Sequence, residues 1–305
     1  MLPVDASAVE ERAVPTAASG VALGLLASMR PRQWIKNAFL LAPLVFSRRG
    51  DALGSVERAL AALGLFCLLA GSVYLFNDLV DRERDQLHPV KRLRPIASGL
   101  LPVRVAGAAA ALFAAGSLAL SFVLSPSFGG VPLAYLALQI AYTFWVKHWV
   151  LLDVFAIAAG FVLRVVAGAL VIAVPISNWL YLCTLLLALF LALGKRRAEL
   201  SEASEGHRPS LALYSVPLLD QLIGIVSACT ILAYALYTLA PETTQKFGSD
   251  RLKFTVPCVM FGLFRYLFLV HRRGRGGAPE RVLLSDAPLL ACVGIFSALV
   301  LWAIY

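Results

Sequence analysis

Three aspartates and an asparagine directly follow a long apolar run, in the stretch YLFNDLVDRERDQLHPVKRLRP that begins at Tyr74. Asp78, Asp81 and Asp85 have the spacing i, i+3, i+7, so a helix would place them on one face, with Asn77 at its border. Like charges on one helix face repel each other, and a cation between them would relieve that repulsion. Mg²⁺ typically binds one or two carboxylates together with water and substrate phosphates. The spacing therefore predicts a magnesium site formed by these four residues, with the three aspartates catalytic.

A basic run follows the aspartates within a few residues. Lys91, Arg92 and Arg94 lie between Pro89 and Pro95, which favour an extended, kinked backbone. Guanidinium groups bind phosphate oxygens in a two-pronged geometry. A metal on one wall and these cations on the other predict a pocket for a diphosphate. Two alternatives are a solvated helix end with local Asp–Arg pairs, and a proton or cation relay in a transporter.

A weaker copy of this pattern occurs in AYTFWVKHWVLLDVF, residues 141–155. Asp153 follows Tyr142 at the same distance at which Asp85 follows Tyr74. We interpret the copy as a second charged helix end that faces the same cavity. Asp153, Tyr142 and Lys147 are then candidates for substrate-phosphate binding, and Lys147 is also a candidate catalytic residue. The alternative for Lys147 is a membrane anchor whose ammonium reaches the interface.

Other polar side chains lie within or beside apolar runs, where a charge usually faces a cavity and marks function. The further candidates for phosphate binding are Gln33, Lys36, Asn37, Arg164, Lys195 and Arg196. Alternatives remain open for several of them. Lys36 could be an interfacial anchor, and Arg196 could anchor the topology while pairing with Glu199. Arg265, a second arginine within an apolar run, could instead pair with a neighbouring acid.

The composition is that of an integral membrane protein. Of the 305 residues, 60% are hydrophobic and 15% are charged, whereas soluble domains are about 25% charged. A membrane-spanning helix needs about 20 mainly apolar residues. The candidate spans are 33–49, 55–77, 103–124, 130–147, 153–173, 177–194, 217–240, 254–271 and 287–305. We expect an all-α polytopic protein with about nine transmembrane helices around a central cavity open to the cytoplasmic side.

Charge distribution predicts the orientation of these spans. Most of the 27 Lys and Arg residues fall in connections on the same side as the N-terminus, which the positive-inside rule makes cytoplasmic. We expect the plasma (inner) membrane, a disordered cytoplasmic tail over 1–28, and one helical domain over 29–305. No basic soluble domain exists to bind nucleic acid. The sequence contains no G-x-S-x-G, Walker or dinucleotide motif and no C-x-x-C pair, which argues against the common hydrolase, ATPase, NAD and cysteine-zinc classes.

The pattern NDLVDRERD followed by RPIASG resembles the UbiA-type intramembrane prenyltransferase superfamily. Its first aspartate-rich motif has the form N-D-x-x-D-x-x-x-D, and every position is filled here. The likeness covers most of residues 30–305. It implies helices around a central cavity, and two aspartate-rich segments that bind Mg²⁺ and a diphosphate.

The second motif departs from the usual family pattern, because it offers only Asp153, with Lys147 ahead of it. Together with RPRQWIKN (30–37), GFVLRVVAG (160–168) and GKRRAEL (194–200), this variant resembles the decaprenyl-phosphate phosphoribosyltransferase branch. The resemblance implies transfer of 5-phosphoribosyl from phosphoribosyl diphosphate (PRPP) to a polyprenyl phosphate, which releases diphosphate and supplies arabinofuranosyl donors for cell-wall glycans. Membrane lipids and a possible homo-oligomer complete the expected partners.

Two other functions compete with this reading. The first is Mg²⁺-dependent transfer of a prenyl group from a prenyl diphosphate to an aromatic acceptor, on the same fold and metal site. The second is a membrane transporter, which would explain charges within spans but not stacked aspartates beside an arginine-rich turn.

Overall fold

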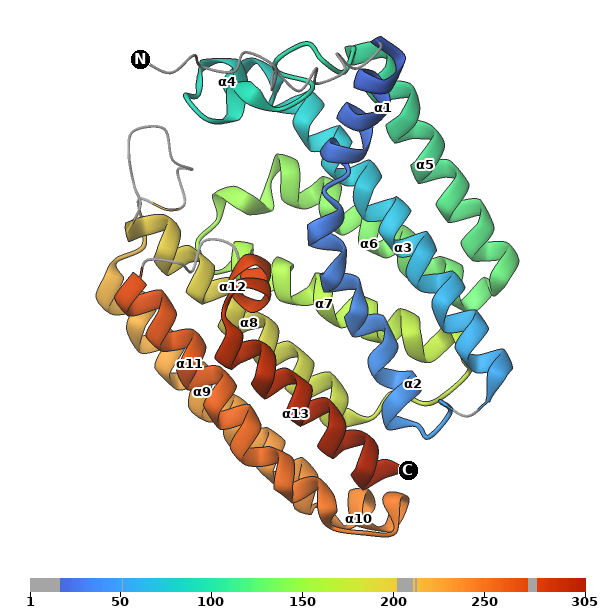
Figure 1. Ribbon diagram of the computed structural model, residues 1–305, viewed down its shortest axis with the longest axis vertical. Coiled ribbons are helices and arrows are strands. Elements are labelled where there is room, and N and C mark those ends of the chain that lie inside the picture. Colours follow the sequence, from blue (N-terminus) through green and yellow to red (C-terminus); the bar gives the residue numbers. More distant parts are fainter. Residues whose placement is uncertain (1–16, 51, 202–210, 212, 274–278) are drawn as a thin grey trace, which may run out of the picture.

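The described part of the chain is built from helices. The computed structural model describes residues 17–50, 52–201, 211, 213–273 and 279–305, and every regular element in these ranges is helical (Figure 1). The α-helices are α1 (Ala17–Ser28), α2 (Ala42–Phe46), α3 (Leu53–Val80), α4 (Arg82–Leu87), α5 (Val103–Leu124), α6 (Pro126–Phe144), α7 (Leu152–Val171), α8 (Asn178–Ser201), α9 (Val216–Leu239), α10 (Pro241–Phe247), α11 (Val256–Arg273), α12 (Pro279–Ser285) and α13 (Ala287–Ile304). The 3₁₀ helices are η1 (Pro31–Leu41), η2 (Lys91–Leu93), η3 (Val146–His148) and η5 (Arg251–Thr255). The all-α prediction is confirmed.

Seven helical segments in the described ranges are long and apolar enough to cross a membrane: α3, α5, α7, α8, α9, α13 and the continuous segment Arg251–His271. They coincide with seven of the nine predicted spans. The span predicted at 130–147 corresponds to α6, a 19-residue helix in which Pro132 and Gln139 interrupt the apolar sequence. The span predicted at 33–49 corresponds to η1 followed by α2. The predicted number of nine spans is therefore approximate.

The predicted disordered tail needs a correction, because residues 17–28 form α1. Val21 and Leu25 of this helix pack against a buried cluster that includes Leu75 and Leu101. Apolar contact with α3 and with the turn before α5 gives the segment a reason to fold. Residues 1–16, the rest of the predicted tail, lie outside the described residues.

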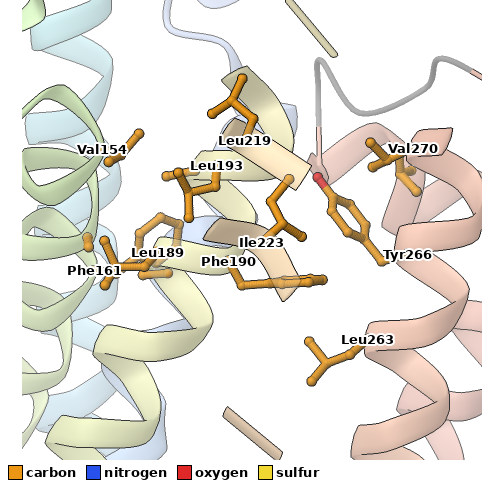
Figure 2. Close-up of a cluster of buried hydrophobic side chains, with 14 of the residues drawn as sticks. Val154, Phe161, Leu189, Phe190, Leu193, Leu219, Ile223, Leu263, Tyr266 and Val270 are labelled. Carbon is orange, nitrogen blue, oxygen red and sulfur yellow. The ribbon is translucent and has the colours of Figure 1, made fainter. Parts of the chain in front are cut away.

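Successive long helices pack against one another: α3 contacts α5, α5 contacts α6, and the series continues through α7, α8 and α9. A large buried cluster joins α7, α8, α9 and α11, with Phe161, Phe190, Ile223 and Tyr266 among its members (Figure 2). In Figure 1, α4 lies at one end of the molecule and α10 lies at the opposite end. The charged segment after α3 is thus at one end of the helix bundle.

The segment predicted as the first span is unusual because η1 is an 11-residue 3₁₀ helix, whereas 3₁₀ runs longer than three or four residues are uncommon. η1 packs against both α3 and α7. A Cβ atom at Gly168 of α7 would lie 1.9 Å from the carbonyl oxygen of Leu40, so only glycine allows this approach of the two backbones. The contact fixes the position of η1, which carries Gln33, Lys36 and Asn37.

Gly168→Ala should displace η1 from α7, because the added methyl group overlaps a backbone atom that no rotamer change can move. We expect a loss of about 1–3 kcal/mol in stability together with lower activity, measured by thermal unfolding of the purified protein in detergent. Gly116→Ala in α5 is the matched control, since a Cβ atom there meets nothing within 4 Å. Equal melting temperatures for the two variants would contradict the proposed close approach.

Candidate active site

Two of the three predicted aspartates are buried together at the end of α3. Asp78 is 3% exposed and Asp85, in α4, is 4% exposed. α3 ends at Val80, but helical hydrogen bonding continues through the turn: the N–H of Asp81 donates to the Asn77 carbonyl, and the N–H of Asp85 donates to the Asp81 carbonyl, both at 2.9 Å. The near-helical path explains why the i, i+7 spacing does place Asp78 and Asp85 side by side.

A single guanidinium nitrogen lies between these two carboxylates. Nη1 of Arg94 donates to Oδ1 of Asp78 at 3.1 Å and to Oδ2 of Asp85 at 2.6 Å. Arg30 donates a further charged hydrogen bond to Oδ1 of Asp78. Buried carboxylates need cationic or hydrogen-bonding partners to remain ionised. In this structure arginine supplies the cation whose presence the aspartate spacing predicts.

The other two predicted metal ligands are arranged differently. Asp81, at the turn between α3 and α4, is half-buried, and its carboxylate has no hydrogen bond or ion pair to any described residue. Oδ1 of Asn77 accepts a hydrogen bond from the Thr143 hydroxyl of α6 at 2.8 Å. Asp81 is therefore available to a ligand, whereas Asn77 is oriented by the second motif.

The donor set fits a magnesium ion only in part. Within the described ranges, no three His, Cys, Asp or Glu side chains are grouped closely enough to hold a metal. Oxygen atoms of Asp78 and Asp85 nevertheless converge on one position, and hard carboxylate oxygens are the ligands that Mg²⁺ prefers. The Arg94 guanidinium occupies that position as a stand-in cation. The magnesium site remains a prediction, and it requires Arg94 to move.

Arg30 is a site residue that the motif spacing did not reveal. It is 48 residues from Asp78 in sequence, and its guanidinium also stacks over the Tyr74 ring, 5.0 Å from the centroid. Its backbone is left-handed, with φ 53°, and it precedes Pro31, which makes the conformation doubly unfavourable. Such strain persists only where surrounding contacts impose it, and it is frequent at functional sites. The only sequence signal for Arg30 was that it directly precedes Pro31, just before the first predicted span.

The remaining basic residues of the first segment face solvent. Lys91 and Arg92 of η2 are exposed, and only Arg94 of the predicted trio reaches the aspartates. Lys91 and Arg92 lie next to the buried ion pairs along the chain, so their role in phosphate binding stays a prediction.

The second motif forms its own buried ion-pair cluster. Asp153, at the start of α7, is fully buried and accepts hydrogen bonds from Nε of Arg196 at 2.6 Å and from the Tyr214 hydroxyl at 2.7 Å. Arg196 is 2% exposed, donates to the Tyr142 hydroxyl at 2.8 Å and pairs with Glu199. Desolvation by burial and the hydrogen bond to Asp153 raise the pKa of Tyr214, which keeps it a neutral donor.

This arrangement brings Asp153, Tyr142 and Arg196 together, as the sequence predicts, but they bind each other. Tyr214 and Glu199 complete the cluster. The ion pair of Arg196 with Glu199, the alternative given for Arg196, is confirmed, whereas the sequence analysis did not anticipate Tyr214. Lys147, in η3, is half-buried, and Lys195 pairs with Glu199 at 3.7 Å. Phosphate binding by these residues stays a prediction.

The two motifs contact each other directly. The Thr143–Asn77 hydrogen bond joins α6 to α3, and the rings of Phe76 and Phe144 meet edge to face, with centroids 6.1 Å apart. Phe76 and Phe144 are the residues paired when the two sequence segments are aligned on their tyrosines. Their contact is consistent with the interpretation of an internal repeat.

A third polar network lies where η1 meets α7. Arg164 is 5% exposed. Its guanidinium donates to Oδ1 of Asn37 at 2.8 Å, to the Gly160 carbonyl at 2.7 Å and to the Tyr135 hydroxyl at 3.0 Å. These three acceptors are neutral. Within the described part of the chain, the buried Arg164 cation is therefore stabilised by hydrogen bonds and is not paired with a carboxylate. The network joins η1, α6 and α7, and it shares no residue with the Asp153 cluster.

On η1, Lys36 donates to Oε1 of Gln33 at 2.6 Å, and the Tyr74 hydroxyl reaches the same oxygen at 3.4 Å. Tyr74 connects these residues to Arg30 and hence to Asp78. The other arginine within a span has a different environment. Arg265 makes a two-pronged ion pair with Asp286, at 3.1 and 2.9 Å, so the structural alternative for Arg265 is confirmed.

Residues 38–285 match the UbiA prenyltransferase family. The chain belongs to this family. The match covers the helices that carry both charged clusters, and membership accounts for a multi-pass membrane protein of the transferase class.

Relatives of known name resemble the chain along most of its length. It is 34% identical over 314 residues to the decaprenyl-phosphate phosphoribosyltransferase of Mycolicibacterium smegmatis, with 97% of this chain and 98% of the relative covered. A protein of the same name from Corynebacterium glutamicum is 33% identical, with 95% and 90% covered. Among solved structures, a UbiA homologue from Archaeoglobus fulgidus bound to DMAPP and Mg²⁺ superposes with a TM-score of 0.68 at 21% identity, over 92% of this chain and 99% of that chain. That likeness concerns the fold.

Asp153→Asn should act mainly on stability. The substitution leaves the buried Arg196 with Glu199 as its remaining acid, so we expect a loss of about 3 kcal/mol. Tyr214→Phe should cost about 2 kcal/mol, because it removes two hydrogen bonds, one donated to Asp153 and one accepted from the Leu151 N–H. Thermal unfolding in detergent measures both. Asp250→Asn, whose carboxylate is largely exposed, serves as the control. Normal stability with lost turnover in Asp153→Asn would instead make Asp153 a substrate ligand.

Proposed function

We propose that this protein transfers the 5-phosphoribosyl group of PRPP to a polyprenyl phosphate, such as decaprenyl phosphate, and releases diphosphate. The observation that carries the proposal is similarity of at least 33% identity over almost the full length to relatives named for this activity. The site supports it, because its buried carboxylates, arginines and lysines suit two phosphorylated substrates. The product would supply arabinofuranosyl donors for cell-wall glycans.

The donor diphosphate would bind at the end of α3. Arg30 and Arg94 would grip its oxygens in the two-pronged geometry that guanidinium groups favour, and Lys91 and Arg92 would contribute from η2. Asp78, Asp81 and Asp85, assisted by Asn77, are the residues that would hold Mg²⁺. When bound, the ion would offset the negative charge that develops on the departing diphosphate.

The transfer breaks the bond between C1 of the ribose and the diphosphate oxygen and forms a bond from C1 to an acceptor phosphate oxygen. This phosphate is already ionised, so the protein needs no strong base to activate it. Positioning and fixed charges then carry most of the catalysis. Lys36, Gln33 and Asn37 on η1, Arg164 on α7, and Lys147 are the residues that would orient the acceptor phosphate.

The acceptor is a lipid, which fits a site built at the end of membrane-spanning helices. The positive-inside distribution of Lys and Arg supports a plasma-membrane protein whose N-terminus and charged connections face the cytoplasm, where PRPP is soluble. The proposal also includes association into a homo-oligomer, which the arrangement of the site does not require.

Purified protein in lipid nanodiscs, given Mg²⁺, a polyprenyl phosphate and PRPP labelled in its ribose, should transfer label to the lipid phase, and EDTA should abolish the transfer. Asp81→Ala should lower the rate by about 100-fold without unfolding the protein, because the Asp81 carboxylate has no partner among the described residues. Glu83→Ala, at an exposed position in α4, is the matched control. Absence of lipid labelling from folded wild-type protein would overturn the proposal.

The second candidate is transfer of a prenyl group to an aromatic acceptor, favoured by membership of the prenyltransferase family. Prenyl diphosphate and an aromatic acceptor, offered to the same preparation, should give no product by our account. Product formation there, with none from PRPP, would reverse the assignment. A transporter would show an Asp81-dependent flux with no Mg²⁺-dependent turnover of either donor.

A further inference from the structure

The carboxylates that we propose as magnesium ligands are paired with arginines of the protein itself in this structure. Asp78 and Asp85 are almost fully buried, and two arginines supply all of their ionic partners among the described residues. The four groups together have no net formal charge. The Arg30 and Arg94 side chains are each 30% exposed, so solvent and ligands reach the arginines more easily than the buried carboxylates that they contact.

A metal ion alone would gain little by entering this cluster. It would have to displace Arg94 from both carboxylates, and the displaced guanidinium would lose two charged hydrogen bonds without a replacement. The cluster would also acquire an excess of two positive charges in a poorly solvated place. A diphosphate alone would meet the opposite difficulty, because Asp78 and Asp85 would repel it.

We propose that Arg30 and Arg94 are exchangeable counter-ions, which hold Asp78 and Asp85 in the empty site and transfer to the diphosphate when it arrives with a divalent cation. The cation and the diphosphate therefore bind as a coupled pair, and each is bound weakly without the other. The inference rests on the proposed function only in assuming that the donor carries a diphosphate. It would hold equally if the donor were a prenyl diphosphate.

The two arginines differ in how they would move. Arg94 follows the short η2 helix, and its side chain can swing outward from the carboxylates while its backbone stays in place. Arg30 is constrained by its left-handed backbone, by Pro31 and by stacking on Tyr74. It would stay beside Asp78 and change only its hydrogen-bond partner. The strained backbone at Arg30 would thus keep its guanidinium beside Asp78, where it could bind a phosphate oxygen of the incoming diphosphate.

The test measures binding without turnover. Full-length protein in nanodiscs would be equilibrated with Mn²⁺, and the bound ion quantified at a series of free Mn²⁺ concentrations, with and without inorganic diphosphate. For the wild type, we expect diphosphate to raise Mn²⁺ affinity at least about tenfold, a coupling of the size usual between linked sites. The reciprocal measurement, labelled diphosphate with and without Mn²⁺, should give the same factor.

Arg94→Gln should bind Mn²⁺ alone about tenfold more tightly than the wild type, because the competing cation is gone, and most of the gain from diphosphate should disappear. Arg84→Gln makes the same charge change at an exposed position in α4 and should behave as the wild type. Arg30→Gln, which unmasks Asp78 alone, provides a second variant if Arg94→Gln does not fold, and it should also bind Mn²⁺ more tightly.

Tight Mn²⁺ binding by the wild type without diphosphate would overturn the proposal, as would unchanged or weaker Mn²⁺ binding in the folded arginine variants. Neither result depends on PRPP or on a lipid acceptor. A failure of this inference is therefore distinguishable from a failure of phosphoribosyl transfer.

Discussion

The arrangement of the site follows from one constraint: two carboxylates are buried at the end of a membrane-spanning helix, and a buried negative charge must have a positive partner. Asp78 and Asp85 meet that requirement through one nitrogen of Arg94, with Arg30 adding a second contact to Asp78. Removing one partner of such a group typically costs several kcal/mol. Arg94, in the basic turn after α4, and Arg30, the strained residue before η1, therefore both contact these carboxylates.

The same constraint accounts for the reduced second motif. This motif has a single acid, Asp153, which accepts hydrogen bonds from Arg196 and Tyr214. Arg196 in turn donates a hydrogen bond to Tyr142. It therefore serves as an internal support that ties the start of α7 to α8 and to the chain before α9. Asp153 is thus enclosed by its own partners, and phosphate binding by the half-buried Lys147 stays a prediction.

Local patterns predicted the long helices well. Apolar runs of the right length located α3, α5, α7, α8, α9, α11 and α13, because a span is defined by local composition. The weak first span is a 3₁₀ helix followed by α2, and its position depends on a close contact with Gly168 of α7, which no local pattern encodes. The predicted disorder of residues 17–28 was wrong because α1 packs on a surface formed later in the chain.

The sequence identified most residues of the site, but not which of them contact each other. The i, i+7 spacing correctly placed Asp78 beside Asp85, since helical geometry fixes that relation. The spacing could not show that Arg94 is the only one of the three basic residues that contacts the aspartates, or that Arg30, in the turn before η1, contacts Asp78. Arg164 and Arg265 looked alike as charges within spans. Tertiary contacts distinguish them: Arg265 has Asp286 as its counter-ion, whereas Arg164 has only neutral partners among the described residues.

The most direct test of this account is a pair of experimental structures, one of the protein without ligands and one with Mg²⁺ and diphosphate, in which the contacts of Arg94 are compared. The account predicts that Arg94 bridges Asp78 and Asp85 in the first structure and binds diphosphate oxygens in the second, with both carboxylates turned to the metal. A diphosphate bound elsewhere, with Arg94 still between the two aspartates, would contradict it.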